Sequence, residues 1–141
     1  MNGDGVPYLA VANRGSYIYD FQEEQYLFSP DRTVSLFVGR EDGTFQSLGS
    51  IVVGEAPSSV AVGDFNGDGA EDLAVANGYS DTVSVLLGNG DGSFQAARNF
   101  AAGRLPSSVA VGDFNGDGLP DLAVANLGSN NVSILINNTP Q

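Results

Sequence analysis

The chain of 141 residues carries 17 acidic residues against five arginines and no lysine, so its formal net charge of −12 argues against nucleic acid as a partner. It contains no cysteine, which excludes disulfides and thiolate metal sites, and no histidine, which removes the commonest general base and a usual zinc ligand. Any metal site in this chain must therefore be built from oxygen atoms.

The first predicted elements belong to an incomplete repeat. NGDG at 2–5 is followed by LAVAN at 9–13, and TVSLFVGREDGTFQ at 33–46 is typical of two strands joined by a tight turn. Between these segments lies an insert at 14–32, which contains SYIYDFQEEQYLFSPD and breaks the repeat pattern. The insert is both aromatic and acidic.

The second repeat is complete and contains four strand candidates. These are 58–63, where Val60 and Val62 alternate with small residues, then 72–77, 82–87 and 94–102. A glycine-rich turn, GNGDG at 88–92, precedes the last of them. Four strands in one repeat is the composition of a β-propeller blade.

The third repeat begins with a literal copy of the second. PSSVAVGDFNGDG at 57–69 recurs at 106–118, 49 positions later, and DLAVAN at 72–77 recurs at 121–126. The pattern predicts an all-β fold, a single partial β-propeller over 1–141 with repeats at about 1–57, 58–106 and 107–141. By this count the chain has ten strands, or two and a half four-stranded antiparallel blades. Closed propellers have about four to eight blades, so we expect a homo-oligomer or a longer parent protein to complete the ring.

The motif DFNGDGxxDLAVAN resembles the FG-GAP or VCBS repeat found in the propellers of integrin α-subunits and in many bacterial surface proteins. The resemblance covers nearly the whole chain except the insert. It implies a β-propeller in which a calcium loop joins the first and second strands of a blade.

The chemistry of the two complete loops agrees with that implication. Ca²⁺ prefers six to eight oxygen ligands, which a loop with acids or amides at alternate positions can supply. Glycines at the intervening positions allow the tight turn and positive φ that other side chains would resist. The predicted Ca²⁺ ligands are, in the second repeat, Asp64, Asn66, Asp68, Asp72 and the carbonyl of Ala70, and in the third Asp113, Asn115, Asp117, Asp121 and the carbonyl of Leu119.

The acidic turns resemble two other kinds of structure, an EF-hand and a metal-free hairpin turn. An EF-hand needs a bidentate Glu at its twelfth position, where this chain has Val75 or Val124, and the flanking runs are strand-like. A metal-free hairpin turn is the plain alternative for both loops, and it is the favoured interpretation for 41–43 and 88–92. In the first repeat Asn2 and Asp4 match two ligand positions, but Tyr8 replaces the last Asp, so weak calcium binding or none is expected.

These features favour a calcium-stabilised binding or adhesion scaffold over an enzyme. The clustered acids are assigned to calcium, and the serines at 58–59 and 107–108 have no histidine to activate them.

The expected partner is a protein or a glycan. A carbohydrate-binding, lectin-like propeller is the alternative, because the insert offers aromatic stacking surfaces, although a loop whose aromatics cover the exposed blade is the preferred interpretation. The aromatic residues of the insert are Tyr17, Tyr19, Phe21, Tyr26 and Phe28.

The expected location is extracellular or on a cell surface, where millimolar calcium would fill sites of micromolar affinity. No apolar run in the sequence approaches the roughly 18 residues of a membrane span, so no span is expected.

Overall fold

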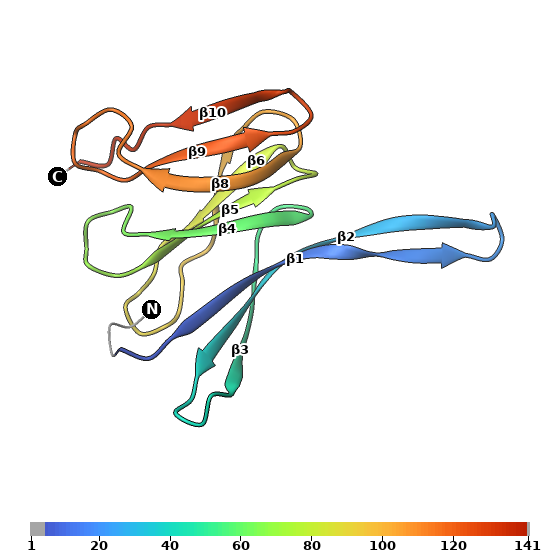
Figure 1. Cartoon of the computed structure of the whole chain (residues 1–141), viewed down its shortest axis with the longest axis horizontal. Coiled ribbons are helices and arrows are strands. Elements are labelled where there is room, and N and C mark those ends of the chain that lie inside the picture. Colours follow the sequence, from blue (N-terminus) through green and yellow to red (C-terminus); the bar gives the residue numbers. More distant parts are fainter. Residues whose placement is uncertain (1–4, 141) are drawn as a thin grey trace.

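A computed structural model describes residues 5–140, which form ten β-strands in three antiparallel sheets (Figure 1). The strands are Tyr8–Asp20 (β1), Gln25–Gly39 (β2), Phe45–Val52 (β3), Pro57–Gly63 (β4), Asp72–Asn77 (β5), Thr82–Leu86 (β6), Arg98–Ala101 (β7), Pro106–Gly112 (β8), Asp121–Asn126 (β9) and Asn131–Leu135 (β10). In this part of the chain no helix has the length and apolar character that a membrane crossing requires.

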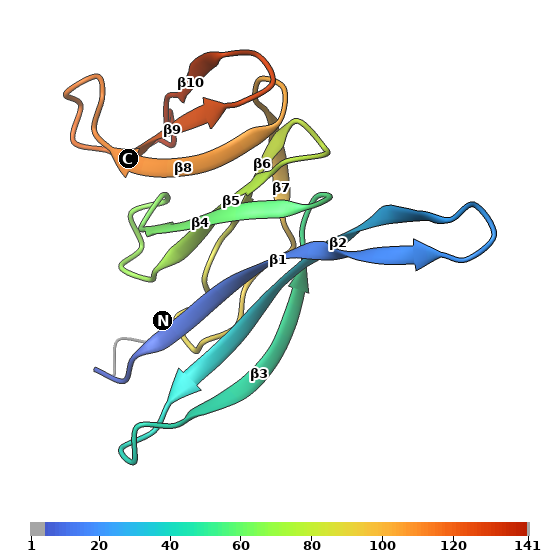
Figure 2. The same cartoon turned by 45° about the vertical axis from the view of Figure 1, so that its right-hand side comes forward.

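Each sheet is a meander of strands that follow one another in the chain. The middle sheet is a four-stranded blade in the order β4-β5-β6-β7, the first has the order β1-β2-β3, and the third has the order β10-β9-β8. The recurring LAVAN segment lies in β1, β5 and β9, so the first sheet contains counterparts of β5, β6 and β7 and the third those of β4, β5 and β6. The three sheets stack beside one another (Figures 1 and 2), which confirms the predicted propeller blades.

Three of the four strands predicted in the second repeat agree with the structure to within one residue, but the fourth is shorter than expected. It was predicted over 94–102 and spans only Arg98–Ala101. Phe94 makes an isolated bridge to Gly88, and both Phe94 and Ala97 pack against the core between the first and second sheets. Residues 94–97 thus contribute to the packing between blades, and within their own blade they make only short pairings next to the turn, such as the bond from the Gln95 N–H to the Leu87 carbonyl.

The hydrophobic core consists of two layers, one on each side of the middle blade. Strand β5 contributes to both because successive side chains of a strand point to opposite faces. Leu73 and Val75 pack into the layer shared with the first blade, where Val34 and Leu36 are buried. Ala74 and Ala76 line the layer shared with the third blade, and all six residues of β5 are buried. Large side chains on one face and small ones on the other let neighbouring blades approach closely.

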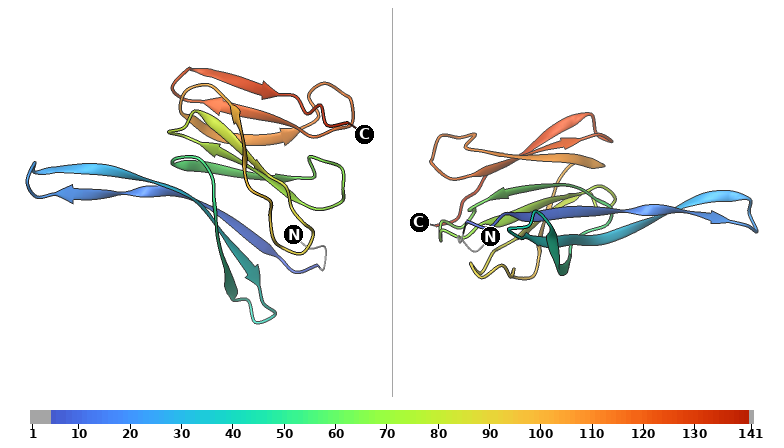
Figure 3. Two further views of the ribbon diagram at one scale, coloured as in Figure 1. Left: turned by 180° about the vertical axis from the view of Figure 1, so that it is seen from behind. Right: turned by 60° about the horizontal axis from the view of Figure 1, so that its bottom comes forward.

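The insert forms a β-hairpin rather than the predicted loop over the blade. Strands β1 and β2 continue past the sheet into a two-stranded arm, defined here as residues 15–30, which projects away from the blades (Figures 1 and 3). Alternating aromatic and aliphatic residues favour the extended conformation. At the arm's base the register shifts between Asn13 and Gly15, and Gly15 has a φ of 121° with the Ser29 carbonyl packed against its Cα. Only glycine fits there.

Candidate metal centre

The two predicted calcium loops occupy equivalent places in adjacent blades. Residues 64–71 join β4 to β5, and residues 113–120 join β8 to β9. Both loops therefore connect the first and second strands of a blade, and both lie at the end of the blades opposite the arm (Figures 1 and 3). The first, incomplete loop, with Asn2 and Asp4, lies outside the described residues.

The carboxylate of Asp64 organises the turn of the second-repeat loop. Its Oδ1 accepts hydrogen bonds from the backbone N–H of Gly67 at 2.7 Å and of Asp68 at 3.1 Å, and its Oδ2 accepts one from Gly69 at 2.9 Å. Gly67 and Gly69 have φ values of 74° and 86°, in the left-handed region that glycine tolerates best. The chain thus curls around the first acid of the motif, as the glycine positions predict.

Asp68 and Asn66 stand on the solvent side of the same turn. Asp68 accepts hydrogen bonds from the backbone N–H of Ala70 at 2.8 Å and from the amide of Asn66, also at 2.8 Å. These two bonds, that of Ala70 foremost, lower the pKa of Asp68, so its carboxylate is ionised at neutral pH. It is an exposed anionic oxygen donor at the mouth of the loop.

Asp72 lies at the base of the loop, where β5 begins, and it is fully buried. Its Oδ2 accepts the N–H of Phe65 at 2.8 Å, and its Oδ1 accepts the N–H of Gly88, in the turn after β6, also at 2.8 Å. Burial is the main cause that raises the pKa of Asp72, and the negative charges of Asp68 and Asp64 raise it further. The buried carboxylate lies among like charges, and in residues 5–140 no cationic side chain pairs with it.

The loop of the third repeat reproduces this arrangement bond for bond. Asp113 accepts the N–H groups of Gly116 at 2.7 Å and Gly118 at 2.9 Å, and these bonds, that of Gly118 foremost, lower the pKa of Asp113. Asp121 is buried, and it accepts the N–H of Phe114 at 2.9 Å and of Asn137 at 2.8 Å. The remaining contacts also match: Asn115 donates to Asp117 at 2.9 Å, and Asp117 accepts the N–H of Leu119 at 2.9 Å.

The donor set of each loop fits a hard cation. A carboxylate has about four lone-pair positions, and the hydrogen bonds above use three on Asp64 and two each on Asp68 and Asp72, so each can still coordinate an ion. All side-chain donors are oxygens, which calcium prefers. As they stand, however, no three acidic side chains within residues 5–140 converge closely enough to hold a metal. Binding would need a local contraction of the loop.

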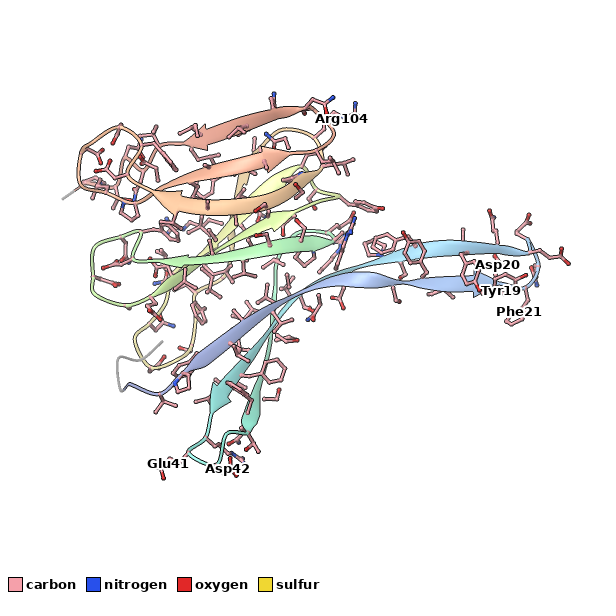
Figure 4. All side chains as sticks on the ribbon, in the orientation of Figure 1. Tyr19, Asp20, Phe21, Glu41, Asp42 and Arg104 are labelled. Atoms are coloured by element: carbon pink, nitrogen blue, oxygen red, sulfur yellow. The ribbon has the colours of Figure 1, made fainter. Side chains whose placement is uncertain are left out.

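The turns at 41–43 and 88–92 have the geometry of plain turns. Asp42 accepts both the N–H and the hydroxyl of Thr44, at 2.9 and 2.6 Å, and Asp91 makes the same pair of bonds to Ser93. In each case the hydroxyl bond is the main cause that lowers the pKa of the Asp. Glu41 and Asp42 extend from the tip of the β2–β3 turn (Figure 4). These acids cap their own turns and offer a matched control for the candidate sites.

Sequence reasoning missed a second set of repeated polar residues, the asparagines that end the LAVAN segments. Asn126 is buried, donates to Ser133 at 2.8 Å and to Asn131 at 3.0 Å, and accepts the N–H of Gly103 at 3.1 Å. Asn77 likewise donates to Ser84 at 2.8 Å. The signal was present, because Asn and Ser recur at the same place in every repeat. These contacts join the second strand of a blade to the third.

Replacing Asn126 by Ala should therefore destabilise the third blade. The partly buried backbone N–H of Gly103 loses its acceptor, and the buried bond network of Asn126 with Ser133 is lost as well, so we expect a cost of about 1–3 kcal/mol. Urea unfolding followed by circular dichroism would measure the change in the free energy of unfolding. Asn138→Ala is the control, because Asn138 is exposed in the segment that follows β10 and its replacement should stay within about 0.5 kcal/mol of the wild-type value. Equal effects of the two substitutions would contradict the interpretation.

The model of the FG-GAP-like repeat family matches residues 1–75 and 64–124, which include both candidate loops. No curated protein matches the chain. The matched segments cover most of the three sheets, so the repeat seen in the sequence, the blades seen in the structure and the family model all describe the same unit.

Proposed function

Since the chain belongs to the FG-GAP-like repeat family, we propose that it is a calcium-stabilised β-propeller module that serves as a binding or adhesion scaffold and not as an enzyme. Calcium would be held by Asp64, Asn66, Asp68, Asp72 and the Ala70 carbonyl, and by the corresponding residues of the third repeat. The ion would supply positive charge to a turn whose own donors are anionic.

The observation that carries this proposal is the buried carboxylate at the base of each loop. Asp72 ties the loop to the turn after β6 through Gly88, and its charge lies next to those of Asp64 and Asp68. Like charges repel, and the repulsion is stronger for a carboxylate that is shielded from water, as Asp72 is. A divalent cation between them would turn that repulsion into attraction, and it would fix the β4–β5 loop against the β6–β7 turn.

The proposals that the chain is not an enzyme, that it is extracellular and that it is a scaffold rest on the chemistry of its residues. The acidic groups of the loops are already engaged with backbone N–H groups, and no histidine exists to activate a serine, so no nucleophile–base pair supports catalysis. Calcium of extracellular concentration is sufficient for a structural site of this kind, which supports an extracellular or cell-surface location. A module of rigid, stacked blades with exposed loops is suited to presenting binding surfaces.

Isothermal titration calorimetry with the purified, chelator-treated chain tests the calcium assignment. We expect two Ca²⁺ ions to bind per chain, one for each complete loop, and Mg²⁺ to bind much more weakly because it demands a smaller, octahedral site. Asp68→Asn should reduce the stoichiometry to one, as should Asp117→Asn. A chain that releases no heat with millimolar Ca²⁺, or that keeps both sites in these variants, would contradict the assignment.

A further inference from the structure

The arm carries an ordered row of aromatic side chains on one face. Tyr17 lies opposite Phe28 in the hairpin register, and Tyr19 lies opposite Tyr26. The ring centroids of these pairs are 5.2 and 5.0 Å apart, and Phe21 in the turn stands 4.9 Å from Tyr19. Because alternate residues of a strand share a face, all four paired rings lie on the same side of the arm.

The row of rings continues onto the blades. Phe28 contacts Tyr79, in the turn between β5 and β6, with ring centroids 5.1 Å apart. The base of the arm therefore contacts the second blade through an edge-to-face pair of rings. Figure 4 shows the arm extending from the stacked blades, with Tyr19, Asp20 and Phe21 at its far end.

These rings are far more exposed than a folded chain needs. Tyr17 is 72% exposed, Tyr26 71% and Phe21 85%. Large exposed apolar patches on a protein mark interaction surfaces, and tyrosine is enriched at the energetic centres of such surfaces. The opposite face of the arm carries Ile18 and Leu27, which are also exposed but do not form an aromatic row.

The charge of the arm indicates what it would bind. Residues 15–31 contain four acids and no lysine or arginine. Glu23 and Glu24 lie in the turn at the far end, next to Phe21, whereas Asp20 is on the Ile18 face and caps that turn, and Asp31 at the base accepts the Thr33 hydroxyl. Two arginines border this stretch at the base of the arm, Arg14 and Arg32. Arg32 forms an ion pair with Glu55 on the connection from β3 to β4. The exposed faces of aromatic rings attract cations through their quadrupole, and neighbouring carboxylates strengthen that attraction. Aromatic rings and acids together are complementary to arginine and lysine.

We propose that the aromatic face of the arm is a docking surface for a protein segment rich in arginine or lysine. This deepens the proposed scaffold function by naming the chemistry of the partner, and it is independent of the calcium loops, which lie at the opposite end of the blades. A second copy of the chain is disfavoured as the occupant because each copy has a net charge of −12. A neutral glycan would use the rings but would leave the acids without a role.

Fluorescence anisotropy with a labelled peptide that alternates arginine and valine tests the proposal on the full chain in calcium. We expect saturable binding that weakens as salt is raised, and none to the peptide in which glutamate replaces arginine. Replacing the two most exposed tyrosines of the arm, in Tyr17→Leu/Tyr26→Leu, should weaken binding about tenfold, since leucine keeps apolar bulk but has no ring quadrupole. Glu23→Gln/Glu24→Gln should weaken it by about threefold.

The matched control is Ile18→Ser/Leu27→Ser, which changes the other face of the arm and should leave the affinity unchanged. In a further variant the four residues that join β5 to β6, Gly-Tyr-Ser-Asp, replace residues 14–32, which removes the arm and should abolish binding without altering the calcium titration. Equal affinity for the arginine peptide and for its glutamate analogue would overturn the proposal. So would an arm-dependent doubling of the mass in light scattering, or arm-dependent binding of a neutral oligosaccharide in place of the peptide.

Discussion

Removing calcium from the chain is expected to lower its melting temperature by about 10 to 20 °C. A ligand present at about a hundred times its dissociation constant stabilises the folded state by roughly 2.7 kcal/mol per site, and the chain has two complete loops. For a domain of this size each kilocalorie per mole shifts the melting temperature by a few degrees. Differential scanning calorimetry in millimolar Ca²⁺ and in excess chelator would measure the difference.

The paired turns of the chain provide the controls for this experiment. Asp68→Asn/Asp117→Asn removes one charged donor from each loop, so this variant should lose most of its response to calcium. Asp42→Asn/Asp91→Asn changes two acids that cap their own turns through Thr44 and Ser93, and it should respond as the wild type does. If the melting temperature is the same with Ca²⁺ and with chelator, the structural role proposed for calcium is wrong.

Periodicity in the sequence predicted the strands and blades well, because the alternation that sets strand faces is local. Val60 and Val62 alternate with small residues, and they lie in β4 as predicted. The position of the loops between the first and second strands of a blade also followed from the order of the repeat. The fourth strand was harder to predict, because Phe94 and Ala97 pack, partly buried, against the layer that the second blade shares with the first.

The insert could not be placed from its composition alone. Its aromatics suggested a cover for the blade, whereas its alternation builds a hairpin that continues β1 and β2 outward. The direction of that hairpin depends on the register shift at Gly15 and on the contact of Phe28 with Tyr79, two long-range features that no local pattern encodes. The sequence identified the residues of the arm and their chemistry, but not their exposure.

In the candidate metal site, too, the local sequence predicts the ligand residues but not their contacts with residues distant in the chain. The sequence specified the donors and the glycines that let the loop turn back toward Asp64. It did not reveal that Asp72 reaches across to the N–H of Gly88, or that Asn137 supplies the equivalent N–H to Asp121. Gly88 and Asn137 share only a position in the repeat. A backbone N–H is available from either residue, so the contact survives a change of side chain.

Identical sequences in this chain have different surroundings, and the phenylalanines of the two DFNGDG motifs show this best. Phe65 is 7% exposed, because its ring packs in the layer shared with the third blade. Its backbone carbonyl also accepts a hydrogen bond from the side chain of Asn137 at 2.7 Å. Phe114, within the same thirteen-residue motif, is 49% exposed. Phe65→Ala should therefore destabilise the chain by about 3–5 kcal/mol, as expected for a buried phenylalanine.

Phe114→Ala is the matched control, since it makes the same chemical change in the same motif. It should lower the free energy of unfolding by less than about 1.5 kcal/mol, because little apolar contact is lost at a half-exposed ring. Urea unfolding of both variants in millimolar calcium, followed by circular dichroism, would measure the two values. A large difference would locate the stabilising contribution of this residue in the contact between blades. Equal losses would place it within the calcium loop itself, and the stacking of the second and third blades would then contribute little through Phe65.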